Sequence, residues 1–291
     1  MSRLKNINIQ GSQYTSDNEG NELLHVSNIH ALIQAVGYLK HIAEPYERVF
    51  FRGQTKLYNN MTPPLYRGIK SKGYQNKKHE EINNVIEHFR LNADIFSNIP
   101  SFSHEPLLQH YGIKTTWLDV VDNIWVALWF SLYKSYAVGK KEEFLHFDQR
   151  GGYAEHKSEG TDEKEKYGYI ILICASENRR LSKRKGTIDG SRTEVIDLRI
   201  TTPSIFLRPH SQHGLLFRAR ADSDGRIMDY REFIRGIIRF NVDAANSWLG
   251  TGSILGVRSL FPPPYFDKGY EILLKSQPED SKIGKIQHIG A

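Results

Sequence analysis

The sequence contains little cysteine and no long apolar segment. Cys174 is the one cysteine among 291 residues, so no disulfide can form within the chain. Because structural disulfides belong to oxidising compartments, we expect this protein to occupy a reducing one. The first 20 residues lack an apolar run of signal-peptide length. No stretch approaches the roughly 20 apolar residues that cross a bilayer. We therefore expect a soluble, cytoplasmic protein without a membrane partner.

Several common catalytic signatures are also missing. The chain has no G-x-S-x-G, no H-E-x-x-H and no G-K-[ST]. The glycine-rich stretch 250–256 follows a predicted helix rather than a strand, so we interpret it as a turn and not as a phosphate loop. His210 and His213 lie three residues apart, but no Asp, Glu or Cys is placed nearby as a further ligand. Metal sites need three or four ligands, so we expect no metal.

Positive charge and aromatic residues, by contrast, are plentiful. The net charge is +6, and there are 15 tyrosines and 14 phenylalanines. A basic surface attracts nucleic acid and nucleotide phosphates, and aromatic rings can stack on bases. The cationic run 179–185 can steer phosphates, although such a run is more often a solvated loop. Composition therefore leaves two interpretations open: a polyanionic partner, or a soluble protein with a well-filled core.

Apolar periodicity predicts helices and strands in irregular alternation. Helices are predicted at 29–39, 79–96, 125–132 and 242–249. Strands are predicted at 49–51, 169–175, 194–200, 214–218 and 237–241. Because the spacing lacks regular βαβ units, we expect an α+β fold with a mixed central sheet and flanking helices.

Residues 26–275 are expected to form a single domain. Residues 1–25 are polar and rich in Asn, Ser and Gly, so we expect a flexible leader, and 276–291 are expected to form a tail. Residues 138–166 are dominated by Lys, Glu, Asp, Gly and His. Such a composition cannot bury enough apolar surface to offset the entropy of ordering, so we predict a mobile insertion there.

A strand-end arginine is the first candidate for ligand recognition. Arg52, Gly53 and Gln54 follow the apolar run 49–51. A strand would fix the guanidinium, whose fork can bind a phosphate or carboxylate bidentately, and glycine would let a ligand approach the backbone. A structural salt bridge followed by a turn glycine is the alternative.

Polar residues lie among apolar ones in the segment 107–131: Gln109, His110, Tyr111, Thr115, Asp119 and Asn123. Buried polar groups must find partners, so they either satisfy the fold internally or face a pocket. Asp119 and Asn123 also fit as helix caps, and His110 also fits as a hydrogen-bonded structural histidine. Gln212, just before a glycine and an apolar strand, is a further candidate.

These segments together resemble the FRG domain, a bacterial and phage family named for its Phe-Arg-Gly motif. The segments that carry the resemblance are Phe51–Gln54, Thr62–Arg67, Gln109–Gly112 with the signature running on to Phe130, Gln212–Phe217, and Leu260–Gly269. The sequence departs from the family pattern at Thr116, Val120, Val121, Ile124 and Pro263. Because of these departures, the loop geometry and the substrate of the family cannot be carried over to this chain, whereas the resemblance itself stands.

The order of these motifs is in turn similar to that of ADP-ribosyltransferases. That resemblance implies a split sheet in which Arg52 clamps the pyrophosphate of NAD and Tyr111 stacks on nicotinamide. It also implies that Thr115 holds the pocket edge and that Gln212 holds a ribose hydroxyl. The implied catalytic residues are Arg52, Thr115 and Gln212, and the implied NAD-binding residues are Arg52, Gly53, Gln54, His110, Tyr111 and Asn123.

The function implied by the resemblance is NAD-dependent mono-ADP-ribosyltransfer, with NAD as substrate and no metal. The acceptor would be nucleic acid or protein, and a toxin or phage-defence role with an antitoxin partner would fit. Gln212 cannot act as a base, so Glu194 and Glu271 are candidates for activating the acceptor. The alternatives are a non-enzymatic nucleic-acid or nucleotide-binding module and an interaction scaffold with a closed polar core.

Overall fold

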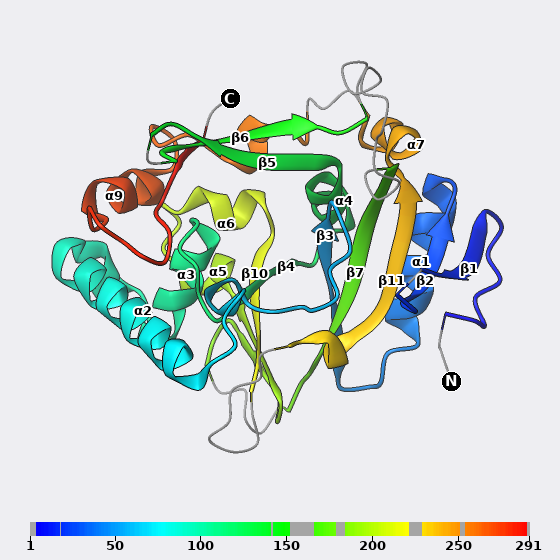
Figure 1. Ribbon diagram of the computed structural model, residues 1–291, viewed down its shortest axis with the longest axis horizontal. Coiled ribbons are helices and arrows are strands. Elements are labelled where there is room, and N and C mark those ends of the chain that lie inside the picture. The colour runs from blue at the N-terminus through cyan, green and yellow to red at the C-terminus, as the bar shows by residue number, and fades with distance from the viewer. Residues whose placement is uncertain are drawn as a thin grey trace.

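The computed structural model describes residues 4–17, 19–140, 142–151, 166–178, 184–220, 229–250 and 254–289. Within them, one large sheet is built from β1 (Ser12–Ser16), β2 (Glu22–Val26), β3 (Glu47–Gln54), β4 (Leu118–Val121), β7 (Tyr167–Ser176), β8 (Thr187–Asp189), β9 (Thr193–Asp197), β10 (Gly214–Ala219) and β11 (Ile234–Asn241). The strand order is β1-β2-β11-β7-β3-β4-β10-β9-β8 (Figure 1). Neighbouring strands are antiparallel except β2 and β11, which are parallel.

Helices and a second, small sheet pack around this large sheet. The helices are α1 (Ile29–His41), α2 (Lys72–Asn92), α3 (His104–His110), α4 (Ile124–Leu132), α5 (Leu198–Thr201), α6 (Leu207–Ser211), α7 (Val242–Asn246), α8 (Val257–Leu260) and α9 (Lys268–Ser276). The small sheet has the order β12-β6-β5 and consists of β5 (Tyr133–Val138), β6 (Phe144–Gln149) and β12 (His288–Ile289). The predicted α+β fold with a mixed sheet is therefore confirmed.

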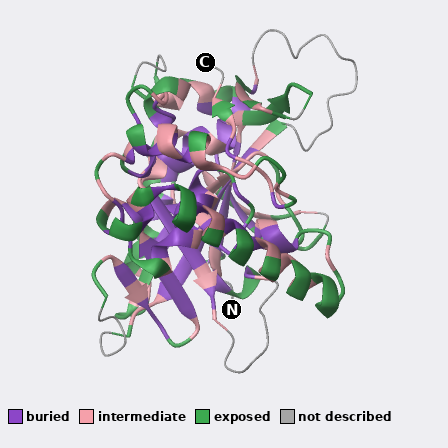
Figure 2. Cartoon of the chain, turned by 90° about the vertical axis from the view of Figure 1, so that its left-hand side faces the viewer, coloured by how far each residue is buried: buried purple, intermediate pink, exposed green. Residues whose placement is uncertain are grey.

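Two apolar cores hold the helices to the large sheet. α1 and α4 pack against β3, β7 and β11, and α2, α3 and α9 surround a second core beside β9 and β10. Figure 1 accordingly shows α1 and α2 at opposite ends of the molecule. Buried residues concentrate in the strands, and exposed residues gather on the outer helices and loops (Figure 2). No described helix is long and apolar enough to cross a membrane.

The large sheet has one weak junction, between β3 and β4. These strands share a single register pair, Phe51 opposite Val121. On its other edge β3 is paired with β7 along its whole length, from Glu47 to Gln54. The two halves of the sheet therefore diverge beyond Phe51, and this divergence creates space beside the end of β3.

The packing of α4 against β3 explains two residues that the sequence offered as ligand contacts. A Cβ atom on Gly53 would lie 1.8 Å from the Ala127 carbonyl oxygen, so only glycine lets the helix approach this closely. Asn123 is the N-cap of α4, and its side-chain oxygen accepts a hydrogen bond from the Trp125 amide. The capping interpretation of Asn123 is therefore correct.

The predicted leader and tail are wrong, because both are part of the fold. Residues 12–16 and 22–26 form β1 and β2, and Leu23 and Leu24 are fully buried. In the predicted tail, Ile283 and Ile286 are buried and β12 pairs with β6. Short strands with a few apolar side chains supply too weak a periodic signal to outweigh polar composition.

The predicted insertion at 138–166 also contains a strand. Residues 144–149 form β6, which is antiparallel to β5. Residues 141 and 152–165 lie outside the described residues. The strand prediction at 194–200 is wrong in its second half, because β9 ends at Asp197 and the Asp197 side chain caps α5 by accepting from the Arg199 amide.

Candidate functional site

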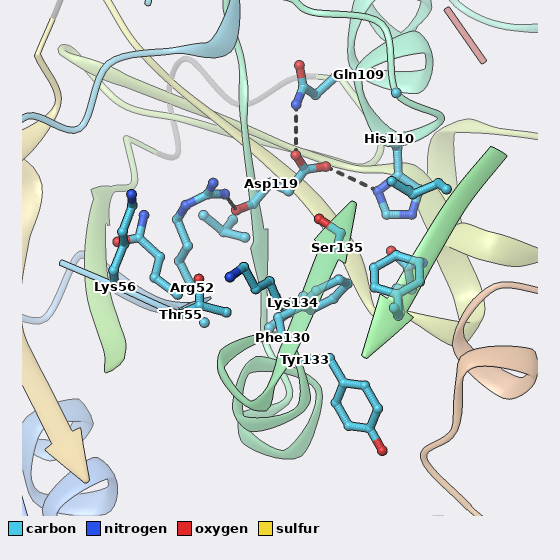
Figure 3. Close-up of a pocket in the computed structure, with 18 of the residues that line it drawn as sticks. Arg52, Thr55, Lys56, Gln109, His110, Asp119, Phe130, Tyr133, Lys134 and Ser135 are labelled. Carbon is cyan, nitrogen blue, oxygen red and sulfur yellow. Dashed lines mark hydrogen bonds and ion pairs between the residues drawn. The ribbon is translucent and has the colours of Figure 1, made fainter. Parts of the chain in front are cut away.

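A cavity of about 1010 Å³ opens where β3 and β4 diverge. Its walls come from the end of β3 and the following loop, from α3, β4 and α6, and from β5 and β6 of the small sheet. Figure 3 shows Arg52, Asp119 and His110 around one space, with Phe130, Tyr133 and Lys134 on its lower side in this view. The cavity therefore gathers side chains from segments far apart in the sequence.

Arg52 lies at the end of β3 and on the cavity wall. Its Nη1 atom donates a hydrogen bond to the Asp119 carbonyl oxygen at 2.6 Å, which joins β3 to β4 beyond their single register pair. Its Nε atom is buried and has no acceptor within the described residues. Burial lowers the pKa of Arg52, the Asp119 carboxylate opposes that shift, and Arg67 adds to it. This guanidinium is thus desolvated and incompletely paired.

Asp119 presents a carboxylate to the cavity. Its Oδ2 atom accepts a hydrogen bond from the Gln109 amide at 2.8 Å, and its Oδ1 atom lies 3.4 Å from Nδ1 of His110. Burial raises the pKa of Asp119, but His110, Arg52 and Gln109 together outweigh burial and lower it below the ordinary value. The side chain remains 40% exposed. Asp119 is therefore an ionised carboxylate that still has room for a ligand.

Gln109 links Asp119 to Thr115. Its side-chain oxygen accepts hydrogen bonds from the Thr115 hydroxyl at 2.9 Å and from the Thr115 amide at 3.1 Å. Thr115 is fully buried, does not line the cavity, and also accepts from the Trp117 amide. Thr115 therefore acts on the cavity through Gln109, and the predicted position at the pocket edge is wrong.

His110 lines the cavity with its ring against the start of β10. A Cβ atom on Gly214 would lie 2.9 Å from Nε2 of His110, so glycine makes room for this ring. The Nε2 atom is buried and has no partner in the part of the chain that is described. With Nδ1 toward Asp119, the imidazole is oriented by the carboxylate.

Tyr111 is buried rather than open to a ligand. Its hydroxyl donates to Oδ2 of Asp267 at 2.7 Å, and burial together with the Asp267 charge raises its pKa. The Arg208 guanidinium lies 4.3 Å from the Tyr111 ring centroid and 4.5 Å from that of Tyr270. Because Arg208 covers one ring face and Phe206 and Tyr270 pack alongside, Tyr111 has no free face for the predicted nicotinamide stacking.

Arg208 is a cavity residue that the sequence did not single out. It is 3% exposed, and its Nε and Nη2 atoms have no acceptor among the described residues. Its cation–π partners come from positions 111, 261 and 270, so only the folded chain assembles them. The nearby Gln212 also lines the cavity, and its amide donates to the Leu260 carbonyl oxygen at 2.8 Å.

The two glutamates predicted as candidate bases lie outside the cavity. Glu194 is buried between Arg184, Arg218 and Arg220, which outweigh the effect of burial and lower its pKa to about 2. Glu271 lies on the surface of α9, where lysines lower its pKa to about 2. Within the part of the chain that the structure describes, the carboxylates that line the cavity are Asp119 and Glu19.

Of the predicted site residues, Arg52, Gly53, Gln54, His110, Tyr111 and Gln212 line the cavity, whereas Thr115 and Asn123 do not. The lining cations that the sequence interpretation missed are Lys56, Arg67, Lys134, Arg150 and Arg208. Arg150 has a structural role, since it donates to the carbonyl oxygens of Ser131 and Tyr167. Within the described ranges, no group of three or more His, Cys, Asp or Glu is arranged to hold a metal ion.

Comparison with known proteins gives one result for the chain. Residues 47–139 match the family model of the FRG domain. The matched range begins with β3, ends just after β5, and includes Arg52, Gln109, His110 and Asp119. Searches of curated proteins and of solved structures gave no match. The chain therefore carries an FRG domain, and the matched region contributes the Arg52–Asp119 wall of the cavity.

Proposed function

We propose that the cavity binds NAD and that the chain transfers ADP-ribose from it to an acceptor. Among the described residues, two carboxylates line the cavity, Glu19 and Asp119, and the cations outnumber them: Arg52, Lys56, Arg67, Lys134, Arg150 and Arg208. Such an excess of positive charge favours a ligand with phosphates. The volume of about 1010 Å³ suits a dinucleotide, since pockets for single drug-sized ligands span roughly 300–1,000 Å³.

The place of the cavity in the fold also supports the proposal. The resemblance to ADP-ribosyltransferases implies a split sheet with an Arg-Gly pair at the end of a strand beside the split. Here the sheet diverges beyond Phe51, and Arg52 and Gly53 follow directly. Arg52 would contact the pyrophosphate, as the motif order implies, and Arg208, which also lines the cavity, would stabilise further negative charge.

Asp119 is the observation that carries the catalytic part of the proposal. It is an ionised carboxylate on a wall otherwise rich in cations. When the bond between nicotinamide and ribose breaks, the electron pair leaves with nicotinamide and the sugar becomes oxocarbenium-like. A fixed carboxylate stabilises that developing positive charge. The acceptor's lone pair then forms the new bond to the sugar, and its proton passes to Asp119 or His110.

The remaining cavity residues have supporting roles in this proposal. Phe130 lies at the end of α4 on the cavity wall, and its ring can stack on nicotinamide in place of the covered Tyr111 (Figure 3). Tyr133, at the start of β5, is stacked on Trp129 with ring centroids 4.3 Å apart, so it supports the wall instead. Gln212 would orient a ribose hydroxyl, since it lines the cavity beside Arg208. Gln109 and Thr115 would position Asp119 rather than touch the substrate.

The test is to measure NAD binding by calorimetry and nicotinamide release by chromatography. Wild-type protein should do both. Asp119→Asn should lower release about 100-fold or more while binding changes little, because its charge acts on the transition state. Arg52→Ala should weaken both binding and release, because its phosphate contact is present throughout.

Glu19→Gln is the matched control, since Glu19 is the other carboxylate on the cavity wall. It should keep nicotinamide release within a small factor of wild type. Equal losses in Glu19→Gln and Asp119→Asn would remove the special role of Asp119. NAD binding without any nicotinamide release would favour a nucleotide-binding module instead.

A further inference from the structure

A segment of positive charge leads away from the cavity and contains no acidic residue. Between Gln54 and His79 the sequence has cations at 56, 67, 70, 72, 77 and 78 and not one Asp or Glu. We call five of them, all exposed, the basic strip: Lys56, Arg67, Lys70, Lys72 and Lys77. Among the described residues, the sixth cation, Lys78, pairs with Glu81. The strip therefore has charge that the fold does not neutralise.

The basic strip is continuous with the cavity. Lys56 and Arg67 both line the cavity, as does Tyr58 between them. The segment then crosses in front of the sheet and leads into α2, whose first residue is Lys72 (Figure 1). A polymer bound along the strip would thus have one part at the cavity mouth.

The start of α2 is an unusual place for so many cations. The N-terminus of a helix carries partial positive charge, so lysines there reduce helix stability and acidic residues increase it. The first turn of α2 contains no acidic residue and begins at Lys72, with Lys70 just before the cap Ser71. Lysines and helix dipole therefore add at this point to attract an anion such as a phosphate.

Exposed aromatic rings accompany these cations. Tyr58 is 53% exposed and Tyr74 is 66% exposed. On α2, Tyr74 and Lys77 are three residues apart and therefore lie on the same face. Lys56 Nζ lies 5.1 Å from the centroid of the Tyr58 ring, so that ring offers a base only its other face. Cations for phosphates and exposed rings for bases are together the features of single-strand nucleic-acid binding, because only unpaired bases can stack on a side chain.

We propose that the basic strip binds single-stranded nucleic acid and delivers it to the cavity as the acceptor of ADP-ribose. Binding along the strip is independent of turnover, whereas the acceptor role rests on the proposed NAD-dependent function. An acidic protein is the competing partner, but it would use the lysines and leave Tyr58 and Tyr74 without bases to stack on.

The binding test uses a short, labelled single-stranded RNA and fluorescence anisotropy over a range of salt concentrations, without NAD. The triple variant K70Q/K72Q/K77Q removes three strip cations that do not line the cavity. The slope of log affinity against log salt should fall by about 2, since each phosphate contact on a single strand contributes about 0.7. Tyr74→Ala should weaken binding about tenfold at fixed salt.

The triple variant K140Q/K166Q/K185Q is the matched control. It removes the same charge from three exposed lysines outside the cavity wall and outside the strip. It should bind RNA like wild type. Equal loss in the two triple variants, or binding of poly-glutamate as tight as that of RNA, would overturn the proposal. NAD binding by calorimetry should be unchanged in all these variants.

The acceptor role is tested separately, with labelled NAD and the same RNA. Label should transfer to the RNA, and transfer should fall in K70Q/K72Q/K77Q more than in the control. RNA binding through the strip with label moving only to added protein would reject nucleic acid as the acceptor. If no nicotinamide is released at all, the proposed function fails while the result for strand binding still holds.

Discussion

Glu194 and Asp119 both have lowered pKa values, but for different structural reasons. Glu194 is enclosed by Arg184, Arg218 and Arg220, with its side chain 2% exposed. Asp119 is held by a glutamine amide and a histidine ring, with its side chain 40% exposed. The Arg52 guanidinium donates to the Asp119 backbone carbonyl oxygen, and not to the carboxylate.

The comparison teaches how to separate a structural ion cluster from a ligand site. Around Glu194, guanidinium donors occupy both carboxylate oxygens, so the cluster satisfies itself. Around Asp119, opposing charges are present but incompletely joined, and a cavity adjoins them. A lowered pKa alone would have selected both residues, whereas the open cavity selects only Asp119.

The largest expected effect on stability comes from breaking the closed cluster. Glu194→Gln should lower the free energy of unfolding by about 3 kcal/mol, because a buried carboxylate that accepts from three arginines is removed. Arg184 and Arg220 keep Asp189 as a partner, which limits the loss. Urea denaturation measures this. Glu271→Gln is the control and should change the midpoint far less, because the ion pairs of Glu271 with Lys268 and Lys275 lie on the helix surface and are screened by solvent. Matching results for the two variants would show that Glu194 is not structural.

The same cluster predicts how stability depends on acid. The pKa of Glu194 is about 2 in the folded protein against an ordinary 4.5. Because folding lowers this pKa, the ionised Glu194 stabilises the folded protein fully above pH 4.5. This stabilisation is lost as the pH falls toward 2. The difference corresponds to about 3 kcal/mol. Glu194→Gln should therefore flatten the fall in stability across this window, and an unchanged slope would contradict the prediction.

Removing the charge of Asp119, in the open cavity, should affect stability much less than removing that of Glu194. Asp119→Asn should lower the free energy of unfolding by less than about 1 kcal/mol, since an amide oxygen can still accept the hydrogen bond from Gln109. Its main effect should be on nicotinamide release. A loss of stability as large as that in Glu194→Gln would mean that Asp119 serves the fold, and the distinction between the two sites would fail.

The smallest effect is expected from removing one arginine of the closed cluster. Arg184 is 39% exposed, and Arg218 and Arg220 remain beside Glu194 when it is replaced. Arg184→Gln should therefore cost about 0.5–1 kcal/mol. A thermal melt compared with wild type measures it. A loss of unfolding free energy equal to that in Glu194→Gln would show that Arg218 and Arg220 do not compensate for the missing Arg184.

Elements with strong periodicity were predictable from the sequence, and weaker ones were not. The apolar stretches around Val49 and Ile171 predicted the central strands β3 and β7, and the apolar run at 125–132 predicted α4. β1, β2, β6 and β12 escaped prediction because they are short and their apolar residues are few. β1 and β6 pair with strands that are close in sequence, β2 and β5, but their polar composition hid both hairpins. β12 pairs with the distant β6, and such pairing leaves no local signal.

The candidate site was predictable in part for the same reason. Arg52 could be recognised because it directly follows an apolar strand. Asp119 fitted a helix cap equally well, although Leu118 and Val120 on either side are buried and the alternation of a strand points Asp119 the other way. Arg208 gave no signal, because its aromatic partners are contributed by residues far along the chain.

The single register pair between β3 and β4 has a consequence for how this domain can vary. The hollow beside Arg52 arises from the divergence of two backbone segments and not from small side chains in a core. Substitutions on its wall can therefore change what it recognises without filling it or collapsing it. Related chains that keep this backbone path could bind different molecules in the same hollow. A change of ligand would then need new side chains on the wall but no change of fold.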